Sequence, residues 1–478
     1  MASRQRNGLF TVRFVLAILF LLAGGGVSQA ANWYVLKGAT GSNNGTSWTN
    51  AWNEMNQVNW SSVNCGDTIW LGGGTYATSL TINKTCTPVN VLNINRVLST
   101  DSVPTAAAGW NSSFDSQVII SSSAEILLNG GAYFTINGRL GTTAGNNFGI
   151  SVRCTSSGGC EGMGPVNPSG NLDHITVTYV EVVGPSCILV AGGGSGACTG
   201  TTDGFNLAPS SNTVTFLLLD HMWIHRWAEA IRTSNWTNCT IQYTDIDTTN
   251  PTAGRAEHED IMYNYANINL TMRYNRIWGS PNDGIFFDFG GTTNFQFYGN
   301  YYYHSGAALM TFKSGYSFGT AFIYNNVFEN DGTFGDVQPG GVNFNGSMTG
   351  GVLENNVFEN VSANGTSQLT TADYNAYSTS VGKNDSGGHS FTYNPGTLGS
   401  SVLFLNESTS NPVAADFHLT STGATTLQNG LALPSPYNLD ADGNTRGVGG
   451  NWYIGAYQYS GSQSQAPQPP TGVVVAVQ

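Results

Sequence analysis

The chain has 478 residues, of which 9% are charged, and 29 acidic residues against 16 basic ones give a formal net charge of −13. This charge excludes nucleic acids and anionic membranes as main partners, because both are polyanions that bind basic surfaces. Helical globular proteins place more Lys and Glu on their helix surfaces than this chain contains. Together with 61 glycines, the composition indicates β-strands and turns.

The first 30 residues have the pattern of a secretory signal peptide. Arg4, Arg6 and Arg13 form a positive segment, residues 14–22 are almost entirely apolar, and cleavage is expected after Ala30. The apolar run is shorter than the ~20 residues that span a bilayer, so we expect no membrane span in the mature, extracellular protein. Residues 461–478, rich in Pro, Gln and Ser, predict a disordered tail or a linker.

The seven cysteines all follow the predicted cleavage site. Export into an oxidising compartment favours disulfides, and the spacing matches no zinc-binding pattern. Neighbours in the sequence are the favoured partners, although sequence alone does not define connectivity. The expected pairs are Cys65–Cys86, Cys154–Cys160 and Cys187–Cys198, with Cys239 left free.

The most informative feature is an internal repeat. Residues 325–330 (NNVFEN) recur unchanged as residues 355–360, and looser copies precede them. Strand-length segments separated by Gly, Asn and Asp turns, with no helical period, predict one coil of a β-solenoid per repeat. One turn position, expected to form a stacked amide ladder, recurs at steps of 24 to 31 residues as Asp220, Thr244, Asn275, Asn300, Asn325 and Asn355.

A second family of strands interleaves with the first. Its inward residues are Phe205, Ile231, Ile261, Ile285, Met310 and Val342 and, two positions later, Leu207, Thr233, Tyr263, Phe287, Phe312 and Phe344. Because side chains alternate between the two faces of a strand, the residues between and after them are expected on the outer face. These outward columns are Asn206, Arg232, Met262, Phe286, Thr311 and Asn343, then Ala208, Ser234, Asn264, Asp288, Lys313 and Asn345.

Both ends of the repeat region resemble a known family. Residues 65–76 (CGDTIWLGGGTY) resemble the first full coil of many secreted right-handed β-helix proteins, and residues 440–446 and 454–459 are similar to their closing segment. The chain thus resembles the pectate-lyase-like superfamily. The resemblance implies an all-β, single-domain right-handed parallel β-helix over residues 31–460, capped at both ends, with an extracellular polysaccharide as partner. We expect a monomer. The superfamily contains lyases, hydrolases, epimerases and non-catalytic binders, so the fold does not select the reaction.

Acidic residues recur where the strands of the second family begin. Neighbouring coils lie ~4.8 Å apart, so stacked carboxylates repel one another unless a cation lies among them. Calcium suits such a site because it takes about six to eight oxygen ligands in flexible geometry. The candidate calcium ligands are Asp203, Glu229, Glu257, Glu259, Asp260 and Asp283. The alternative is that these acids are solvated residues that cap backbone N–H groups at turns.

Lys313 stands on the predicted outer face, one coil after Asp288. In β-helix lyases of the resembled superfamily, a Lys or Arg removes the proton α to a uronate carboxylate while calcium neutralises that carboxylate. The resemblance therefore implies Lys313 as the base, and Arg232 could hold a substrate carboxylate through two hydrogen bonds. Lys313, Asp288 and Arg232 are the catalytic candidates. The alternative is that Lys313 and Asp288 form only a surface ion pair.

The remaining outward residues are candidates for contacts with the polysaccharide: Asn206, Asn264, Phe286, Asn343, Asn345 and, among the acids, His258. Three functions stay open. The first is calcium-assisted β-elimination of an acidic glycan. The second is glycoside hydrolysis by an Asp/Glu pair, which Asp260, Asp283 and Asp288 could supply. The third is non-catalytic glycan binding or a structural role at the cell surface.

Overall fold

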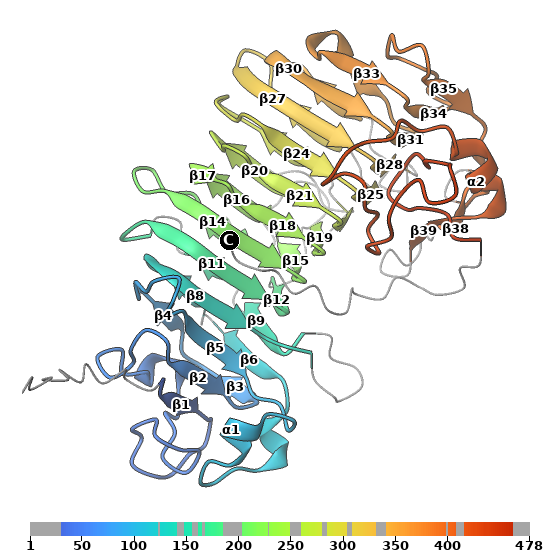
Figure 1. Ribbon diagram of the computed structural model, residues 1–478. Coiled ribbons are helices and arrows are strands. Elements are labelled where there is room, and N and C mark those ends of the chain that lie inside the picture. Colours follow the sequence, from blue (N-terminus) through green and yellow to red (C-terminus); the bar gives the residue numbers. More distant parts are fainter. Residues whose placement is uncertain are drawn as a thin grey trace, which may run out of the picture.

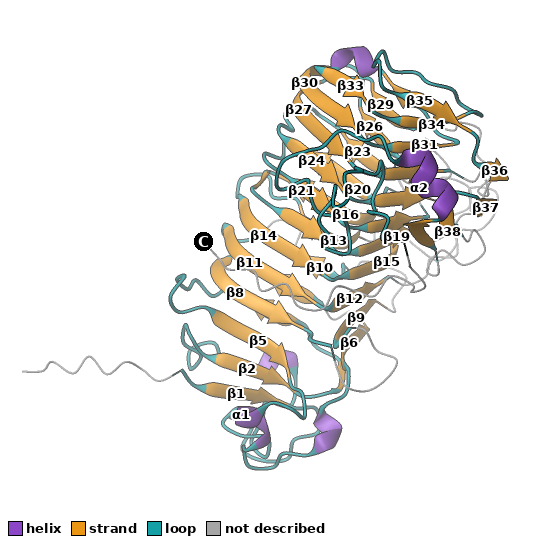
Figure 2. Ribbon diagram, turned by 45° about the vertical axis from the view of Figure 1, so that its right-hand side comes forward, coloured by secondary structure: helices purple, strands orange, loops and turns teal. Residues whose placement is uncertain are grey.

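The chain winds into a right-handed parallel β-helix, as the computed structural model shows (Figures 1 and 2). The structure describes residues 30–122, 125–140, 148–154, 161–164, 168–184, 203–227, 229–248, 260–279, 284–303, 308–330, 341–397, 400–407 and 415–461. Each coil passes through three sheets, named here A, B and C, and pairs in parallel with the next coil in each sheet. The predicted fold class is confirmed.

In the described residues, sheet A contains β1 (Asn32–Val35), β2 (Thr68–Leu71), β5 (Leu92–Arg96), β8 (Gly131–Asn137), β11 (Leu172–Thr178), β14 (Val214–Asp220), β17 (Trp236–Thr237), β18 (Thr240–Gln242), β21 (Thr271–Arg273), β24 (Phe295–Tyr298), β27 (Ser317–Tyr324), β30 (Ser347–Glu354) and β33 (Thr371–Asp373). Sheet B contains β3 (Gly74–Tyr76), β6 (Val118–Ser122), β9 (Ile150–Cys154), β12 (Val180–Val183), β15 (Trp223–Trp227), β19 (Asp245–Thr248), β22 (Arg276–Trp278), β25 (Tyr301–Tyr303), β28 (Val327–Glu329), β31 (Val357–Glu359), β34 (Ala376–Ser378) and β35 (Phe391–Tyr393). Sheet C contains β4 (Leu80–Ile82), β7 (Ile126–Leu128), β10 (Met163–Gly164), β13 (Asp203–Leu207), β16 (Glu229–Ser234), β20 (Met262–Tyr265), β23 (Ile285–Phe287), β26 (Met310–Phe312), β29 (Val342–Phe344) and β32 (Ala363–Asn364).

The interior of the coil is one continuous apolar cluster to which all three sheets contribute. Like residues stack from coil to coil: the rings of Phe287 and Phe312 lie 4.3 Å apart, and those of Phe312 and Phe344 lie 5.4 Å apart. Strand alternation brings them there, since Ile285 and Phe287 belong to this cluster and Phe286 between them does not. Stacked rings bury a large apolar area at close-packed density, which stabilises each coil on the next.

An amide ladder also runs through the interior, as predicted. The side-chain oxygen of Asn300 accepts hydrogen bonds from the backbone and side-chain nitrogens of Asn275, at 2.9 and 3.0 Å. Equivalent bonds continue along the column Thr244, Asn275, Asn300, Asn326, Asn356 and Asn375. The predicted positions Asn325 and Asn355 were therefore wrong by one residue. Both have left-handed backbones, and their amides bond to the C-terminal segment, at Tyr437 and Leu431.

The strand register differs from the predicted alignment at one step. Ile231 pairs with Met262 rather than with Ile261, and Met262 pairs with Ile285. Tyr263 therefore lies on the outer face, and Asn264 lies inside, where its Oδ1 accepts a 3.0 Å hydrogen bond from Thr233. Asn264 is fully buried, so its predicted placement among the ligand-contacting residues was wrong. A one-residue slip exchanges the two faces of a strand because side chains alternate.

The C-terminal segment packs on the outer face of sheet B (Figures 1 and 2). It contains β38 (Phe404–Asn406), β39 (Asp416–Leu419) and α2 (Ser421–Leu427), preceded by the small hairpin β36 (Gly396–Thr397) and β37 (Ser400–Ser401). The ring centroid of Phe417 lies 5.0 Å from those of both Tyr301 and Tyr303. Apolar side chains of the segment thus cover sheet B in these coils, and Tyr437 also contacts sheet A at Tyr298 and Tyr324.

A buried ion cluster holds this C-terminal segment together. His418 contacts Asp416 through Nδ1 and lies 2.7 Å from Asp442 through Nε2. Burial alone would lower the pKa of His418, but the two carboxylates raise it to about 9. The imidazole is therefore charged at neutral pH and contributes to the stability of the segment.

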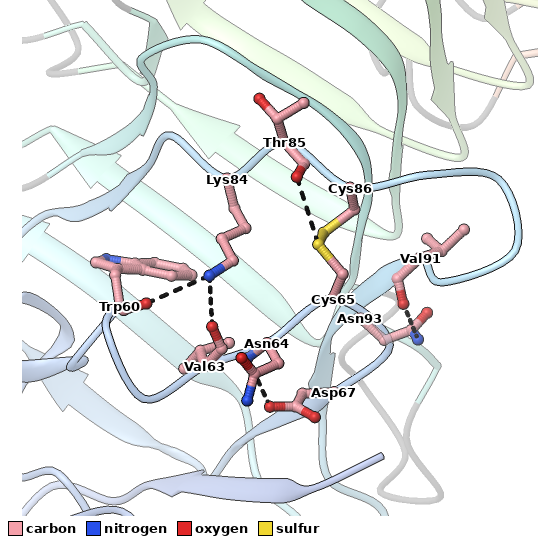
Figure 3. The surroundings of a disulfide bond; sticks show 10 residues. All are labelled: Trp60, Val63, Asn64, Cys65, Asp67, Lys84, Thr85, Cys86, Val91 and Asn93. Carbon is pink, nitrogen blue, oxygen red and sulfur yellow. Dashed lines mark hydrogen bonds between the residues drawn. A yellow bond between two sulfur atoms is a disulfide. The ribbon is translucent and has the colours of Figure 1, made fainter. Parts of the chain in front are cut away.

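The N-terminal coils carry α1 (Ser102–Thr105) and short 3₁₀ turns at Met55–Gln57 and Ser112–Phe114, and a third such turn lies at Thr366–Gln368. Figure 3 shows the predicted Cys65–Cys86 disulfide, which is confirmed. Cys154 is also disulfide-bonded, and Cys239 is free and buried. Cys160, Cys187 and Cys198 lie outside the described residues, as do the predicted signal peptide up to residue 29 and the tail from residue 462. Among the described helices, none has the length and apolarity needed to cross a membrane.

Candidate functional site

A row of acids lies at one edge of sheet C. The pairing of β10, β13, β16 and β20 aligns the inward residues Met163, Phe205, Ile231 and Met262. Two positions before them stand Glu161, Asp203, Glu229 and Asp260. We call these four residues the acid column. Neighbouring members belong to neighbouring coils, so their backbones are ~4.8 Å apart.

The acid column contains three of the predicted ligands, Asp203, Glu229 and Asp260, together with Glu161, which was not predicted. The register shift places Asp260, not Glu259, in line with Glu229. Glu161 was missed because 42 residues separate it from Asp203, a step longer than those of the aligned coils. Its position two residues before an apolar strand residue was the available signal. Glu257, His258, Glu259 and Asp283 lie outside the described residues.

Glu161 and Asp203 share one hydrogen-bond donor. Nδ2 of Asn206 lies 3.4 Å from Oε1 of Glu161 and also donates to Oδ2 of Asp203. Burial, then the negative charges of Asp203 and Glu125, raise the pKa of Glu161 to about 7. Burial raises the pKa of Asp203 to about 6, against the opposing influence of Arg232 and Asn206. Burial thus raises the pKa of both carboxyls, so a proton shared by the two is retained to higher pH than on a solvated carboxyl.

Arg232 supplies the positive charge next to the acid column. Its Nη1 lies 3.7 Å from a carboxylate oxygen of Asp203 and at the same distance from Glu229. Its guanidinium also lies over the ring of Tyr263, 5.3 Å from the centroid. Burial would lower the pKa of Arg232, but the nearby Glu229 carboxylate raises it, so the group stays charged. The guanidinium also interacts with the hydroxyl of Tyr265, so it links the acid column to the two tyrosines on the outer face.

A second polar cluster contains Lys313. Its Nζ donates a 2.6 Å hydrogen bond to Oδ1 of Asp288, whose Oδ2 accepts a 2.5 Å bond from the hydroxyl of Tyr263. The ammonium also lies between 5.4 and 5.7 Å from the ring centroids of Phe286, Phe289 and Tyr316. The hydrogen bond with Asp288 raises the pKa of Lys313. This shift opposes the predicted role of Lys313 as a base, because a base must first lose its proton.

The acid column and the pair Lys313–Asp288 lie at opposite ends of the sheet C strands. Asp260 precedes β20, whereas Asp288 and Lys313 follow β23 and β26. Five residues of extended chain separate the two positions, which is roughly 16 Å. Arg232 and Tyr263 lie between them and connect them through the contacts above. The described residues therefore form two linked clusters rather than the single predicted site.

The other predicted contact residues occupy the outer face of sheet C with different exposure. Phe286 is buried, Asn343 is half-buried, and Asn345 is exposed. Asn343 accepts a 2.8 Å hydrogen bond from Asn364 in the next coil, so its amide is part of an outer ladder. The face thus presents amides at one end of the stack and the two charged clusters towards the middle.

The fit of a cation to the acid column rests on two orphaned oxygens. Within the described residues, Oδ1 of Asp203 and Oδ1 of Asn206 are buried and accept no hydrogen bond. Unsatisfied buried acceptors next to further carboxylates match what a cation with oxygen ligands requires. However, no group of three or more His, Cys, Asp or Glu in the described part is close enough to hold a metal ion. Calcium binding stays a prediction.

The comparisons with known proteins concern the architecture. No protein-family model and no curated protein matches this sequence. Among solved structures, the chain is similar to pectate lyase Pel9A, with 13% identity over 91% of this chain and 98% of that one and a TM-score of 0.47. It is similar to the Dettilon tailspike protein, with 12% identity over 77% and 70% of the two chains and a TM-score of 0.42. It is also similar to a lacto-N-biosidase from Eubacterium ramulus, with 9% identity over 76% and 68% and a TM-score of 0.38. At these identities the likeness concerns the coiled fold alone.

Proposed function

We propose that the protein cleaves a polysaccharide by glycoside hydrolysis at the acid column, with Glu161 as proton donor and Asp203 as nucleophile. The observation that carries the proposal is that both carboxylates lie within hydrogen-bond reach of one nitrogen, Nδ2 of Asn206. Two carboxylates that share one donor lie in neighbouring coils and close together, as the retaining mechanism requires of its carboxyl pair, ~5–5.5 Å apart. The proposal assigns the retained proton to Glu161, whose pKa of about 7 is above the value of about 6 at Asp203, and the negative charge to Asp203.

The reaction follows from these protonation states. Asp203 attacks the anomeric carbon while the glycosidic C–O bond breaks and Glu161 gives its proton to the leaving oxygen. Water then displaces Asp203 from the sugar, and Glu161 takes up the proton of that water. Asp203 is only 1% exposed, so the proposal requires the substrate to displace neighbouring side chains such as Arg232, which lies 3.7 Å from its carboxylate.

Release of reducing ends from a panel of neutral and acidic polysaccharides tests the proposal. The expected products are saturated, and their anomeric configuration, followed by NMR during turnover, matches that of the substrate. Asp203→Asn should abolish turnover, and azide should restore it with the opposite anomer by taking the place of the missing nucleophile. Inverted products from the parent protein, or full activity of Asp203→Asn, would contradict the assignment. Binding without turnover would favour a non-catalytic glycan-binding protein.

A second candidate is calcium-assisted β-elimination of an acidic glycan, which the orphaned oxygens of Asp203 and Asn206 favour. Asp203, Asn206 and Glu229 would hold the ion. When bound, calcium would neutralise a substrate carboxylate and acidify the adjacent C–H. Lys313 as the base would need to lose its proton against the ion pair with Asp288, so the rate should climb into the alkaline range. Unsaturated uronate ends that disappear with a chelator would establish this candidate over hydrolysis.

A further inference from the structure

A hollow lies where strands β8 and β11 of sheet A begin, away from the acid column. It has a volume of about 440 Å³ and is open to solvent, within the ~300–1,000 Å³ typical of small-molecule sites. Three successive coils line it, with Asn83 and Thr85 in the first, residues 129–132 in the second, and residues 169–171 and Asp173 in the third. None of the residues proposed for hydrolysis belongs to this lining.

Glycines form the floor of the hollow. Gly131 has a φ of +121°, and a Cβ placed on it would lie 2.3 Å from the carbonyl oxygen of Lys84. A Cβ on Gly130 would lie 3.1 Å from the backbone nitrogen of Gly170. Side chains are therefore sterically excluded at Gly131 and crowded at Gly130. Glycine at these two positions therefore lets the backbones of neighbouring coils approach closely beside the hollow.

The polar groups around the hollow are mostly uncharged amides. Asn129 and Asn171 use their side-chain oxygens to accept bonds from the backbone nitrogens of Ser169 and Thr213, both at 3.1 Å. In the described part of the chain, the side-chain NH₂ groups of both residues make no hydrogen bond, and the exposed Asn83 makes none through its amide.

Among the residues that line the hollow, Asp173 is the charged one, and its carboxylate already has two partners. Its Oδ1 accepts a 2.5 Å hydrogen bond from Thr215 and lies 2.9 Å from Nδ1 of His174. The nearby Lys84 does not face the hollow: Figure 3 shows its ammonium turned towards the carbonyl oxygens of Trp60 and Val63, which it contacts at 3.4 and 2.5 Å. The hollow therefore offers no cation to an acidic sugar.

Three stacked rings border the hollow. Tyr133, His174 and Phe216 each follow a residue at the start of a sheet A strand, and their centroids are 4.5 and 4.4 Å apart. Phe216 is the outermost of the three and is 46% exposed. Ala132 and Asp173, which line the hollow, directly precede Tyr133 and His174. The ring stack and the amides are thus adjacent parts of one surface.

The backbone of these three residues is left-handed, as it is in the separate ring stack Tyr179, His221, Tyr243 and Tyr274. Tyr133, His174 and Phe216 have φ values of 52°, 50° and 50°, in the left-handed region that disfavours aromatic residues. The next three coils fill the same position with Asn238, Asn269 and Asn294, the residue type that tolerates this conformation. Rings in place of Asn at this position give the surface an apolar part next to its amides.

We propose that this surface, formed by the hollow and the Tyr133–His174–Phe216 stack, binds an uncharged oligosaccharide. The C–H face of a pyranose would pack on the exposed ring of Phe216, because the negative face of an aromatic ring attracts polarised C–H groups. Sugar hydroxyls would accept hydrogen bonds from the amides of Asn83, Asn129 and Asn171. The site would hold a polysaccharide while a different face acts on it, so it does not depend on the proposed hydrolysis.

Calorimetric titration with cellohexaose, xylohexaose and hexagalacturonate tests this inference. The parent protein should bind at least one neutral hexasaccharide and bind hexagalacturonate much more weakly. Phe216→Asn removes the ring but keeps a residue suited to the left-handed backbone, and it should weaken binding by about tenfold. Asn83→Ala, at an exposed residue, should weaken it as well. Val448→Ala, which trims an exposed apolar side chain of the C-terminal segment, is the matched control and should leave the affinity unchanged.

Absence of binding to both neutral hexasaccharides, or equal affinity of Phe216→Asn and the parent, would overturn the inference. A preference for hexagalacturonate would also overturn it, because the hollow offers no cation. Glu161→Gln should bind the neutral hexasaccharide like the parent. Loss of hydrolysis and loss of this binding are therefore separate observations, and failure of one proposal does not imply failure of the other.

Discussion

Substitution of Glu161 by Gln is the sharpest test of the acid column. The change removes the proton that the leaving oxygen needs, while the shape of the side chain and one hydrogen-bonding oxygen remain. Glu161 is half-buried, and its Oε1 lies at the long distance of 3.4 Å from Asn206, so the fold should tolerate the substitution. We expect hydrolysis to fall by ~10²–10⁴-fold, the usual contribution of a general acid. That loss corresponds to about 3–5 kcal/mol of transition-state stabilisation.

The pH profile of the parent gives the second half of this prediction. Activity requires Asp203 ionised and Glu161 protonated, so it should rise with pH through about 6 and fall through about 7. In Glu161→Gln the fall on the alkaline side should disappear, because no proton remains to be lost, while the rise on the acidic side stays with Asp203. The rate of Glu161→Gln should fall least with a substrate that has a good leaving group, because its leaving oxygen needs little protonation.

The assay is release of reducing ends from the best polysaccharide of the panel between pH 4 and 10. Glu354→Gln is the matched control: Glu354 ends β30 in sheet A, and its pKa is also raised by burial and a neighbouring acid, Asp373. The control should retain parent activity. If Glu161→Gln lost less than about fivefold, or kept the alkaline limb, the reasoning from burial and charge repulsion at Glu161 would be refuted.

Three further predictions concern charge, stability and the ladder. Lys313→Met should raise KM with little change in kcat if hydrolysis is right, and abolish unsaturated products if β-elimination is right; steady-state kinetics on an acidic glycan separate these outcomes. For His418, the raised pKa of about 9 means that its stabilising effect is complete below pH ~6.5 and disappears as pH rises through 9. His418→Gln should therefore lower the unfolding free energy by about 3 kcal/mol at pH 6 and hardly at all at pH 10, as denaturant titrations at both pH values would show. Asn326→Ala should destabilise by roughly 2–4 kcal/mol, because it leaves buried amide groups of two neighbouring coils unpaired; an unchanged melting temperature would contradict this.

Much of the fold follows from local patterns. Alternation of apolar residues, Asn at recurrent turns and the exact copy of residues 325–330 at 355–360 were enough to predict a parallel solenoid with an internal amide ladder. Sheet B was harder to recognise from the sequence, because strands of this sheet such as Val327–Glu329 are three residues long and directly follow the residues of the amide ladder. For the candidate site, the sequence predicted only that it lies on the outer face of one sheet. Which residues belong to it depended on the register of the strands.

What the sequence by itself determined is the coil: side-chain alternation and turn chemistry act within a few residues, so they can be read from neighbours in the chain. The tertiary structure decided which residue of one coil pairs with which residue of the next coil. The pairing of Ile231 with Met262 exchanged Asn264 for Tyr263 on the outer face, and the pairing of Met163 with Phe205 brought Glu161 beside Asp203 across a long connection. The raised pKa values of these carboxyls likewise come from burial and from charges on other coils, which are properties of the assembled stack.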